Sequence, residues 1–322
     1  MYTFLITASS FATPGVARLQ AAGCRILYVR DETELGAVMA SENIDAVISR
    51  TMLLNANAIQ SCASLKVISK HGAGYNNIDV AAATARHIPV FFTPGANAQS
   101  VAELAIGLII AVARTIPLHD RTLRAGGWSR SEMGLQLSGR TIGVIGLGNI
   151  GQKVARLAEA FGMHVLGYDP RVKNISCEMA KSLPELLGRA QILSVNCPLN
   201  DETRGLIGAA ELAQLPRNAI VVNTARGGVV VETALAEAVA SGHVFGAGLD
   251  DFEAEPIAAD HPFNKSPRIV MTPHVGASTR EALDTVSLMS VDNALAFLDK
   301  RHFDKNLCVN PSVLQNQPMV SL

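Results

Sequence analysis

The sequence predicts an α/β protein with two doubly wound parallel-sheet domains. Short β-branched runs alternate with alanine-rich helical stretches, a pattern typical of parallel sheets covered by helices on both faces. A second alternating series begins near residue 140, after a long apolar helix and a glycine-containing loop. At 322 residues the chain is also longer than one ordinary core supports, which favours two domains.

The first series contains four apolar runs of strand length. Strands are predicted at residues 4–7, 25–29, 46–49 and 66–69. Helices are predicted between them, at residues 16–22 and 35–40.

A long apolar helix is predicted over residues 101–113, with Ser100 and Glu103 forming its capping box. This stretch is too short to span a bilayer and carries Glu103, so we interpret it as a buried helix. We therefore expect no membrane association.

Composition excludes several classes of partner and site. The chain has 27 lysines and arginines against 28 acidic residues, so it has no basic field for nucleic acid. Its five cysteines are scattered and form no CxxC pair, which argues for a reducing compartment and against a thiolate metal site. The first ten residues lack the pattern of a secretory signal, so we expect a cytoplasmic protein.

The strongest local signal is GVIGLGNIG, residues 143–151. Its glycines, Gly146, Gly148 and Gly151, lie at a predicted strand-to-helix turn, which is the context a dinucleotide fingerprint requires. In such a turn the glycines permit a tight bend, close approach of a pyrophosphate and close helix packing. The helix N-terminus then offers free amides to the phosphates.

Asp169 ends the next predicted strand, at the position where a carboxylate accepts hydrogen bonds from the adenosine ribose. Its charge repels a 2′-phosphate, so the sequence predicts NAD (as NADH in reduction) rather than NADP. Arg171 is close enough in sequence to weaken that preference.

Three chemically distinct side chains follow later strand-like runs. Arg226 follows residues 219–223, an acidic cluster begins after residues 246–249, and His274 follows residues 268–272. The carboxyl ends of strands in a doubly wound sheet line one crevice. An arginine can hold a substrate carboxylate, and a histidine beside a carboxylate can move a proton. Together with NADH, this set suits reduction of a 2-oxo acid without a metal.

Seven segments, in order and spacing, make the chain similar to the D-isomer-specific 2-hydroxyacid dehydrogenases, and within them to the D-3-phosphoglycerate dehydrogenase-like group. These segments are KVISKHGAGYNNID (66–79), TPGANAQSVAEL (93–104), GVIGLGNIG (143–151), YDP (168–170), NTARGG (223–228), DDFEAEP (250–256) and TPHVGAST (272–279).

The resemblance implies a role for each matching residue. It implies that Arg226 binds the substrate carboxylate, that His274 is the acid/base and that Glu255 is the histidine's partner. The implied cofactor-binding residues are Gly146, Gly148, Asn149, Ile150, Gly151, Asp169, Cys197, Pro198, Thr224, Ala225, Asp250 and Gly276. The implied substrate-binding residues, besides Arg226 and His274, are Arg50, Lys70, His71, Gly72, Ala73 and Gly74. The substrate is expected to be a small anionic 2-oxo or 2-hydroxy acid.

The resemblance also implies the domain organisation. A Rossmann NAD-binding domain, residues 99–284, is expected to be inserted into a flavodoxin-like substrate domain formed by residues 1–98 and 285–322. A homodimer is expected, and the chain corresponds to a short form without the C-terminal regulatory domain of the long phosphoglycerate dehydrogenases.

Two alternatives are considered. Transcriptional corepressors share this fold and sense NADH, but they usually carry longer tails for partners than residues 310–322. A relative of formate dehydrogenase would pair its histidine with a glutamine, and Glu255 argues against that assignment.

Overall fold

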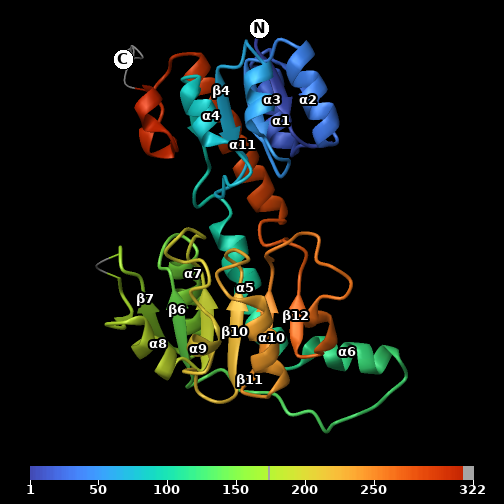
Figure 1. The fold of residues 1–322 in the computed structure, drawn as a ribbon, viewed down its shortest axis with the longest axis vertical. Helices are drawn as coiled ribbons and strands as arrows, with labels where there is room; N and C mark the ends of the chain where they lie inside the picture. Colours follow the sequence, from blue (N-terminus) through green and yellow to red (C-terminus); the bar gives the residue numbers. More distant parts are fainter. Residues whose placement is uncertain (173–174, 315–322) are drawn as a thin grey trace. The chain divides into compact units, whose positions relative to one another are not determined.

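The computed structural model describes residues 1–172 and 175–314 (Figure 1). The chain divides into two compact units. Unit 1 consists of Met1–Asn97 together with the chain from Ser278 onward, and unit 2 is the continuous segment Ala98–Ala277.

Unit 1 contains a parallel sheet whose described strands run in the order β2-β1-β3-β4-β5. This is the flavodoxin-like order, and it confirms the predicted fold class for this unit. The strands are β1 (Thr3–Ile6), β2 (Arg25–Tyr28), β3 (Ala46–Ser49), β4 (Val67–Lys70) and β5 (Val90–Phe91).

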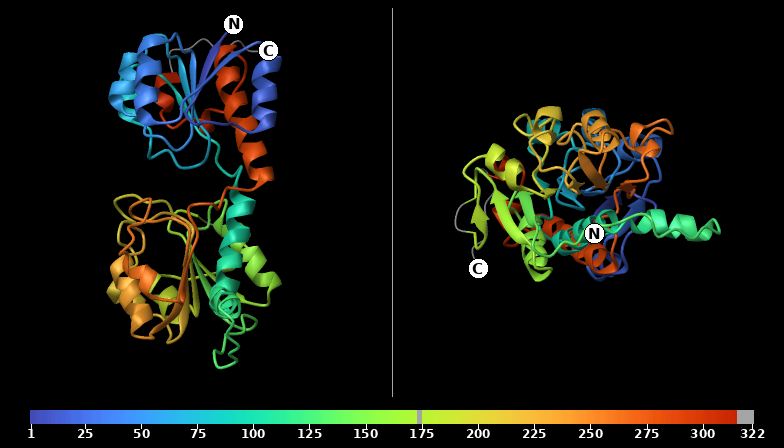
Figure 2. Two further views of the ribbon diagram at one scale, coloured as in Figure 1. Left: turned by 90° about the vertical axis from the view of Figure 1, so that its right-hand side faces the viewer. Right: turned by 90° about the horizontal axis from the view of Figure 1, so that it is seen from below.

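Helices cover both faces of this sheet (Figure 2). Leu5 and Val47 point to one face and pack with the helices α2 and α3, whereas Phe4 and Ile48 point to the other and pack with α1 and α11. The strands β1, β3 and β4 are buried on both faces and read as apolar runs, which is why the sequence revealed them. The helices are α1 (Thr13–Ala21), α2 (Glu32–Ser41), α3 (Ala56–Ser61), α4 (Val80–Ala85) and α11 (Arg280–Leu298), followed by the 3₁₀ turns η2 (Lys305–Leu307) and η3 (Pro311–Leu314).

Unit 2 contains a second parallel sheet, in the order β12-β11-β10-β9-β6-β7-β8. The strand order reverses between β6 and β9, as in a Rossmann fold, and such a reversal creates a crevice at the carboxyl ends of the strands. The strands are β6 (Thr141–Ile145), β7 (His164–Tyr168), β8 (Glu178–Met179), β9 (Ile192–Val195), β10 (Ala219–Asn223), β11 (Val244–Leu249) and β12 (Ile269–Met271).

The faces of the second sheet are covered by two separate groups of helices, which Figure 2 shows on opposite sides. One group packs α5 and α7 against alternate strand residues, and the other packs α8, α9 and α10 against the remaining ones. The helices are α5 (Ala98–Ala113), α6 (Ile116–Arg124), α7 (Gly151–Ala160), α8 (Leu183–Arg189), α9 (Ala209–Leu212) and α10 (Glu232–Ala240), with the 3₁₀ turn η1 (Pro262–Lys265).

The predicted start of the long apolar helix was wrong. The helix α5 begins at Ala98, so Ser100 lies inside its first turn and does not cap it. Glu103 accepts a hydrogen bond from the side chain of Gln99, 2.8 Å away. Within residues 1–172 and 175–314, no single helix is long and apolar enough to cross a membrane, and α5 with α6 passes that test only as a pair bent by 63°.

Candidate active site

Arg226 is positioned by the end of β10. Asn223, the last residue of that strand, is 2% exposed and closes a turn with its side chain. Its amide nitrogen donates to the Arg226 carbonyl over 2.9 Å, and its amide oxygen accepts from Ala225 N–H over 3.0 Å. The guanidinium Nη1 donates to the Ala225 carbonyl over 2.6 Å. The arginine is thus fixed at the carboxyl edge of the sheet.

Asp250, which follows β11, holds the loop that carries His274. Its side chain is buried and accepts from the Thr272 hydroxyl over 2.6 Å, from Val275 N–H over 2.9 Å and from Gly276 N–H over 2.8 Å. These bonds tie the segment after β12 to the end of β11. The implied role of Asp250 in cofactor binding remains a prediction.

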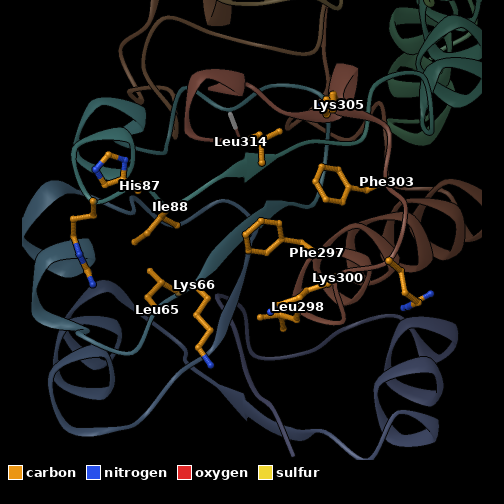
Figure 3. A pocket seen from close by; sticks show the side chains of 12 residues that line it. Leu65, Lys66, His87, Ile88, Phe297, Leu298, Lys300, Phe303, Lys305 and Leu314 are labelled. Carbon is orange, nitrogen blue, oxygen red and sulfur yellow. The ribbon is translucent and has the colours of Figure 1, made fainter. Parts of the chain in front are cut away.

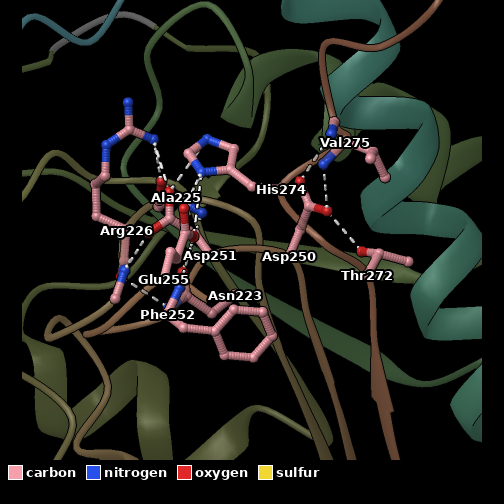
Figure 4. Close-up of polar contacts among 12 residues, drawn as sticks. Asn223, Ala225, Arg226, Asp250, Asp251, Phe252, Glu255, Thr272, His274 and Val275 are labelled. Carbon is pink, nitrogen blue, oxygen red and sulfur yellow. Dashed lines mark hydrogen bonds and ion pairs between the residues drawn. The ribbon is translucent and has the colours of Figure 1, made fainter. Parts of the chain in front are cut away.

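His274 and Glu255 form a direct pair (Figure 4). The ring Nδ1 of His274 lies 2.9 Å from Glu255 Oε2 and 3.1 Å from Oε1. The backbone of His274 has φ 53°, a left-handed conformation that is uncommon outside glycine. The histidine side chain is 48% exposed, so the ring is held by its partner and remains accessible.

Asp251 also lies at this site, although no role was predicted for it from the sequence. Its carboxylate lies 3.1 Å from Arg226 Nη1 and 3.4 Å from His274 Nε2, and it accepts from Gly227 N–H over 2.7 Å. Burial raises the pKa of Asp251, and the Gly227 hydrogen bond and the charge of Arg226 oppose that rise. Two adjacent aspartates directly after a buried strand were the available signal, and the structure buries both of them.

The three predicted catalytic side chains are therefore brought together, with Asp251 contacting both Arg226 and His274. Ligand atoms of Asp251, Glu255 and His274 also lie within 4.8 Å of one another, a spacing that a metal ion could use. Each of these side chains already has a hydrogen-bonding or ionic partner. The expectation that the site needs no metal stays a prediction.

The glycine turn after β6 offers an open surface at the start of α7. A Cβ at Gly148 would meet nothing within 4 Å, whereas a Cβ at Gly151 would lie 1.9 Å from the Gly146 carbonyl oxygen. The first position leaves room for a phosphate, and the second lets the helix pack on the strand. Asn149 and Ile150 lie between these glycines, where the helix begins.

Polar atoms without partners lie at the neighbouring strand ends. Thr224 Oγ1, after β10, and Asn196 Oδ1, after β9, are buried and have no hydrogen-bond partner within the described chain. Buried polar groups are normally satisfied, so these two atoms are suited to a polar ligand. Cys197 is next to Asn196, and burial raises the pKa of its thiol to about 11, so it is neutral. Pro198 follows it.

Asp169 lies beyond β7, beside the glycine turn. Its Oδ2 accepts from Leu147 N–H and its Oδ1 from Arg171 N–H, each over 2.9 Å. The guanidinium of Arg171 is paired with Glu202, 2.6 Å away, and both side chains are exposed. This ion pair joins the loop after β7 to the loop after β9.

In unit 1, the predicted substrate residues follow the carboxyl ends of β3 and β4. Lys70 is 7% exposed, and its ammonium donates to the Arg50 carbonyl and, over 2.7 Å, to Asn77 Oδ1. The buried lysine thus anchors the loop that contains the predicted residues. The Arg50 guanidinium donates to the Ser10 carbonyl over 3.2 Å.

The backbone amides of residues 72–74 differ in availability. Gly72 N–H donates to Thr93 Oγ1 over 3.0 Å. The amides of Ala73 and Gly74 have no acceptor among residues 1–172 and 175–314. They are free to bind oxygen atoms of a ligand.

His71 lies in the same loop with its ring edge-on to Phe11, with 5.4 Å between the ring centroids. Burial, followed by the charge of Arg50, lowers the pKa of His71 to about 3. The ring is therefore neutral at physiological pH and adds no positive charge to the loop.

We expect His71→Asn to reduce the acid sensitivity of folding. The pKa of His71 is about 3 in the folded protein and about 6.5 in the unfolded chain. The contribution of the neutral ring to the free energy of unfolding is therefore complete above pH 6.5 and is lost as the pH falls toward 3. The pKa shift of His71 sets an upper bound of about 3 kcal/mol on the free energy of unfolding that is lost at pH 4.5. We expect a loss of about 1 kcal/mol because the ring is partly solvated. Melting temperatures of the wild type and of His71→Asn at pH 7 and pH 4.5 measure this loss of stability. The variant His302→Asn, which changes an exposed histidine, is the control. An equal loss in both variants would contradict the assignment.

Unit 1 also contains a cavity of about 460 Å³ (Figure 3). Phe297, Phe303 and Ile88 line it, together with basic side chains such as Lys66 and Lys300. It lies at the amino ends of β4 and β5, opposite the ends that carry the Lys70 loop. None of the predicted site residues lines it.

Comparison with known proteins agrees with this geometry. Residues 106–276 match the model of the D-isomer specific 2-hydroxyacid dehydrogenase NAD-binding domain. The chain belongs to the D-isomer specific 2-hydroxyacid dehydrogenase family. The resemblance inferred from its motifs is thereby confirmed.

The chain matches two named relatives over different shares of their length. D-3-phosphoglycerate dehydrogenase of Archaeoglobus fulgidus is 42% identical over 256 residues, which are 77% of this chain and 48% of that enzyme. Hydroxypyruvate reductase of Thermotoga maritima is 40% identical over 266 residues, 81% of this chain and 87% of that enzyme. The chain thus spans about half the length of the phosphoglycerate dehydrogenase it matches.

Solved structures of other proteins have the same fold as this chain. A protein from Thermus thermophilus superimposes with a TM-score of 0.87 at 34% identity, covering 93% of this chain and 98% of its own.

Proposed function

We propose that the protein is an NAD-dependent dehydrogenase that interconverts small 2-oxo acids and D-2-hydroxy acids. The observation that carries this proposal is the His274–Glu255 pair, which shares the carboxyl edge of the unit 2 sheet with Arg226 and the glycine turn. Membership of the dehydrogenase family supports the same reaction class.

The residues present fit a dinucleotide. The open surface at Gly148 suits a pyrophosphate, Asp169 suits the adenosine ribose, and the unpartnered Thr224 hydroxyl suits a polar group of the cofactor. The remaining cofactor residues are proposed as the resemblance implies. The nicotinamide, when bound, donates or accepts the hydride.

We propose His274 as the proton donor in reduction. Its Nδ1 is held by Glu255, so Nε2 is the nitrogen available to give a proton to the substrate carbonyl oxygen. In oxidation the same nitrogen takes the hydroxyl proton. Glu255 orients the ring and stabilises its positive charge, as a carboxylate does beside a catalytic histidine.

Arg226 is proposed to bind the substrate carboxylate. A guanidinium presents two parallel N–H donors, which match a carboxylate in geometry and charge. Fixing the carboxylate fixes the adjacent carbonyl carbon, so the hydride can reach it in one orientation. The free amides of Ala73 and Gly74 are proposed to bind further substrate oxygens, with the Arg50 guanidinium for a second anionic group.

The proposal is tested by mixing purified protein with NADH and a panel of 2-oxo acids. Hydroxypyruvate, phosphohydroxypyruvate, glyoxylate, pyruvate, oxaloacetate and sulfopyruvate should include at least one substrate, measured by loss of NADH absorbance. Turnover should persist in a chelator. Tight NADH binding without turnover on any of them would instead support an NADH-sensing, corepressor-like protein. The preferred acid, the dimer and the cytoplasmic location stay predictions.

We expect NADH to bind far more tightly than NADPH, because two carboxylates, Asp169 and Glu202, surround Arg171. Asp169→Asn with Glu202→Gln removes both charges and frees the guanidinium. The Kd ratio of NADPH to NADH, measured by fluorescence titration, should then fall by about tenfold or more, as 1.4 kcal/mol of lost repulsion would produce.

The matched control is Glu178→Gln, which breaks the exposed pair of Glu178 with Arg189, 2.8 Å apart. It removes one surface charge elsewhere and should leave the ratio unchanged. An unchanged ratio in the double variant would refute the role of these two carboxylates in cofactor choice.

A further inference from the structure

Asp251 is buried among groups that the proposed reaction uses. Its side chain is 8% exposed, whereas the partner of the histidine, Glu255, is 39% exposed. A buried carboxylate is costly unless charges and hydrogen bonds compensate it. Here the compensation comes from Arg226 and His274, two of the residues proposed to contact the substrate.

Close packing of two chain segments holds Asp251 rigidly. Its Oδ1 accepts from Gly227 N–H over 2.7 Å. A Cβ at Gly227 would lie 2.0 Å from the Phe252 carbonyl carbon, so only glycine lets these segments approach so closely. The carboxylate of Asp251 therefore has little freedom to move away from the arginine.

The other carboxylate oxygen of Asp251 lies between Arg226 and His274. Oδ2 is 3.1 Å from Arg226 Nη1 and 3.4 Å from His274 Nε2 (Figure 4). A single acceptor can thus be reached by both donors at once. A substrate oxygen needs the same relation to the guanidinium and the ring.

Both ring nitrogens of His274 consequently face a carboxylate, Nδ1 toward Glu255 and Nε2 toward Asp251. An imidazole with one proton satisfies only one of these acceptors, whereas the imidazolium satisfies both. The charged groups around the ring are Glu255, Asp251 and, beyond Asp251, Arg226; the carboxylate of Asp250 is bonded to the loop backbone.

We propose that Asp251 is a positioning residue that aims Arg226 and His274 at one point and holds the proton on His274 Nε2 until that proton passes to a substrate oxygen. This inference rests on the proposed function for its catalytic meaning. The interaction itself is a property of the free protein, so it can be measured without turnover.

The first experiment follows the ring protons of His274 by NMR as a function of pH, with His274→Gln identifying the signal. In Asp251→Asn and Asp251→Ser, which both remove the charge but differ in shape, we expect the titration midpoint to move to lower pH by about one unit. Asp251→Glu, which restores the charge, should return it toward the wild-type midpoint. Unchanged midpoints in both neutral variants would overturn the inference.

The second experiment measures reduction of the best 2-oxo acid from pH 6 to 9. In Asp251→Asn, kcat/KM should fall about tenfold more at pH 8.5 than at pH 6, because one unit corresponds to a tenfold change in the protonated fraction. The Kd for NADH should stay within twofold. An equal loss at every pH would indicate a merely structural role and overturn the proposal.

Glu253→Gln is the matched control for both experiments. Glu253 belongs to the same acidic cluster and is exposed, and within the described chain its carboxylate contacts neither Arg226 nor His274. It should leave the NMR midpoint and the pH profile unchanged. A wild-type protein that turns over no 2-oxo acid would refute the proposed function, while the NMR result would still decide the role of Asp251.

Discussion

Replacing His274 by asparagine is expected to lower kcat for 2-oxo acid reduction by about 10³-fold, within the range that a positioned acid supplies. Asparagine is preferable to alanine because it tolerates the left-handed backbone, φ 53°, of this position. The side chain of His274 contacts Glu255 and Asp251 and not the glycine turn, so the Kd for NADH should change less than twofold.

Stopped-flow single-turnover rates and NADH fluorescence titrations measure these two quantities separately. His302→Asn, which changes an exposed histidine in unit 1, is the control and should retain full activity. If His274→Asn keeps a tenth or more of the wild-type rate, the proton comes from another group and the assignment is wrong.

The second large effect is expected from Arg226→Lys. Lysine keeps the charge but loses the planar pair of donors, so it cannot hold a carboxylate in two parallel hydrogen bonds. We expect kcat/KM to fall by about 10²-fold or more, with much of the loss in KM. The change would also remove the guanidinium that lies 3.1 Å from Asp251.

The matched control is Arg204→Lys. Arg204 is exposed, and its Nη1 lies 3.6 Å from where a Cβ of Gly228 would be, two residues beyond Arg226. It should leave kcat/KM within twofold. A similar value of kcat/KM for Arg226→Lys and the wild type would show that the substrate carboxylate binds elsewhere.

The fold could be predicted from the sequence because buried parallel strands appear in it as short apolar runs. Residues 46–49 were predicted as a strand and form β3, because both faces of that strand are buried and its apolar run has no polar gap. The strand orders could not be read from periodicity. They followed from the resemblance and from the position of the glycine turn.

Helix boundaries were less predictable. Ser100 has the chemistry of a cap, but Ala98 and Gln99 are compatible with a helix, and the chain continues it backward over them. A capping pattern indicates only where a helix could begin. Where the helix does begin also depends on the packing of the residues before the pattern.

At the site, motif and spacing indicated Arg226 and His274, but the acidic cluster was ambiguous. Four carboxylates lie within residues 250–255, and local pattern cannot tell that Asp250 and Asp251 are buried while Glu253 and Glu255 are exposed. The structure shows Asp251 inward because Gly227 brings another segment against it, and that contact joins residues 24 positions apart. Such long-range packing has no local signature.

The division of the chain has a consequence for synthesis on the ribosome. Unit 2 is continuous and has all its strands once Ala277 has emerged. Unit 1 has its sheet first but lacks α11, whose Val291 and Leu295 cover Phe4 and Ile48, until residues 280–298 are made. The segment that is translated first is therefore the one that completes its folding last, and until then it exposes one apolar face to chaperones.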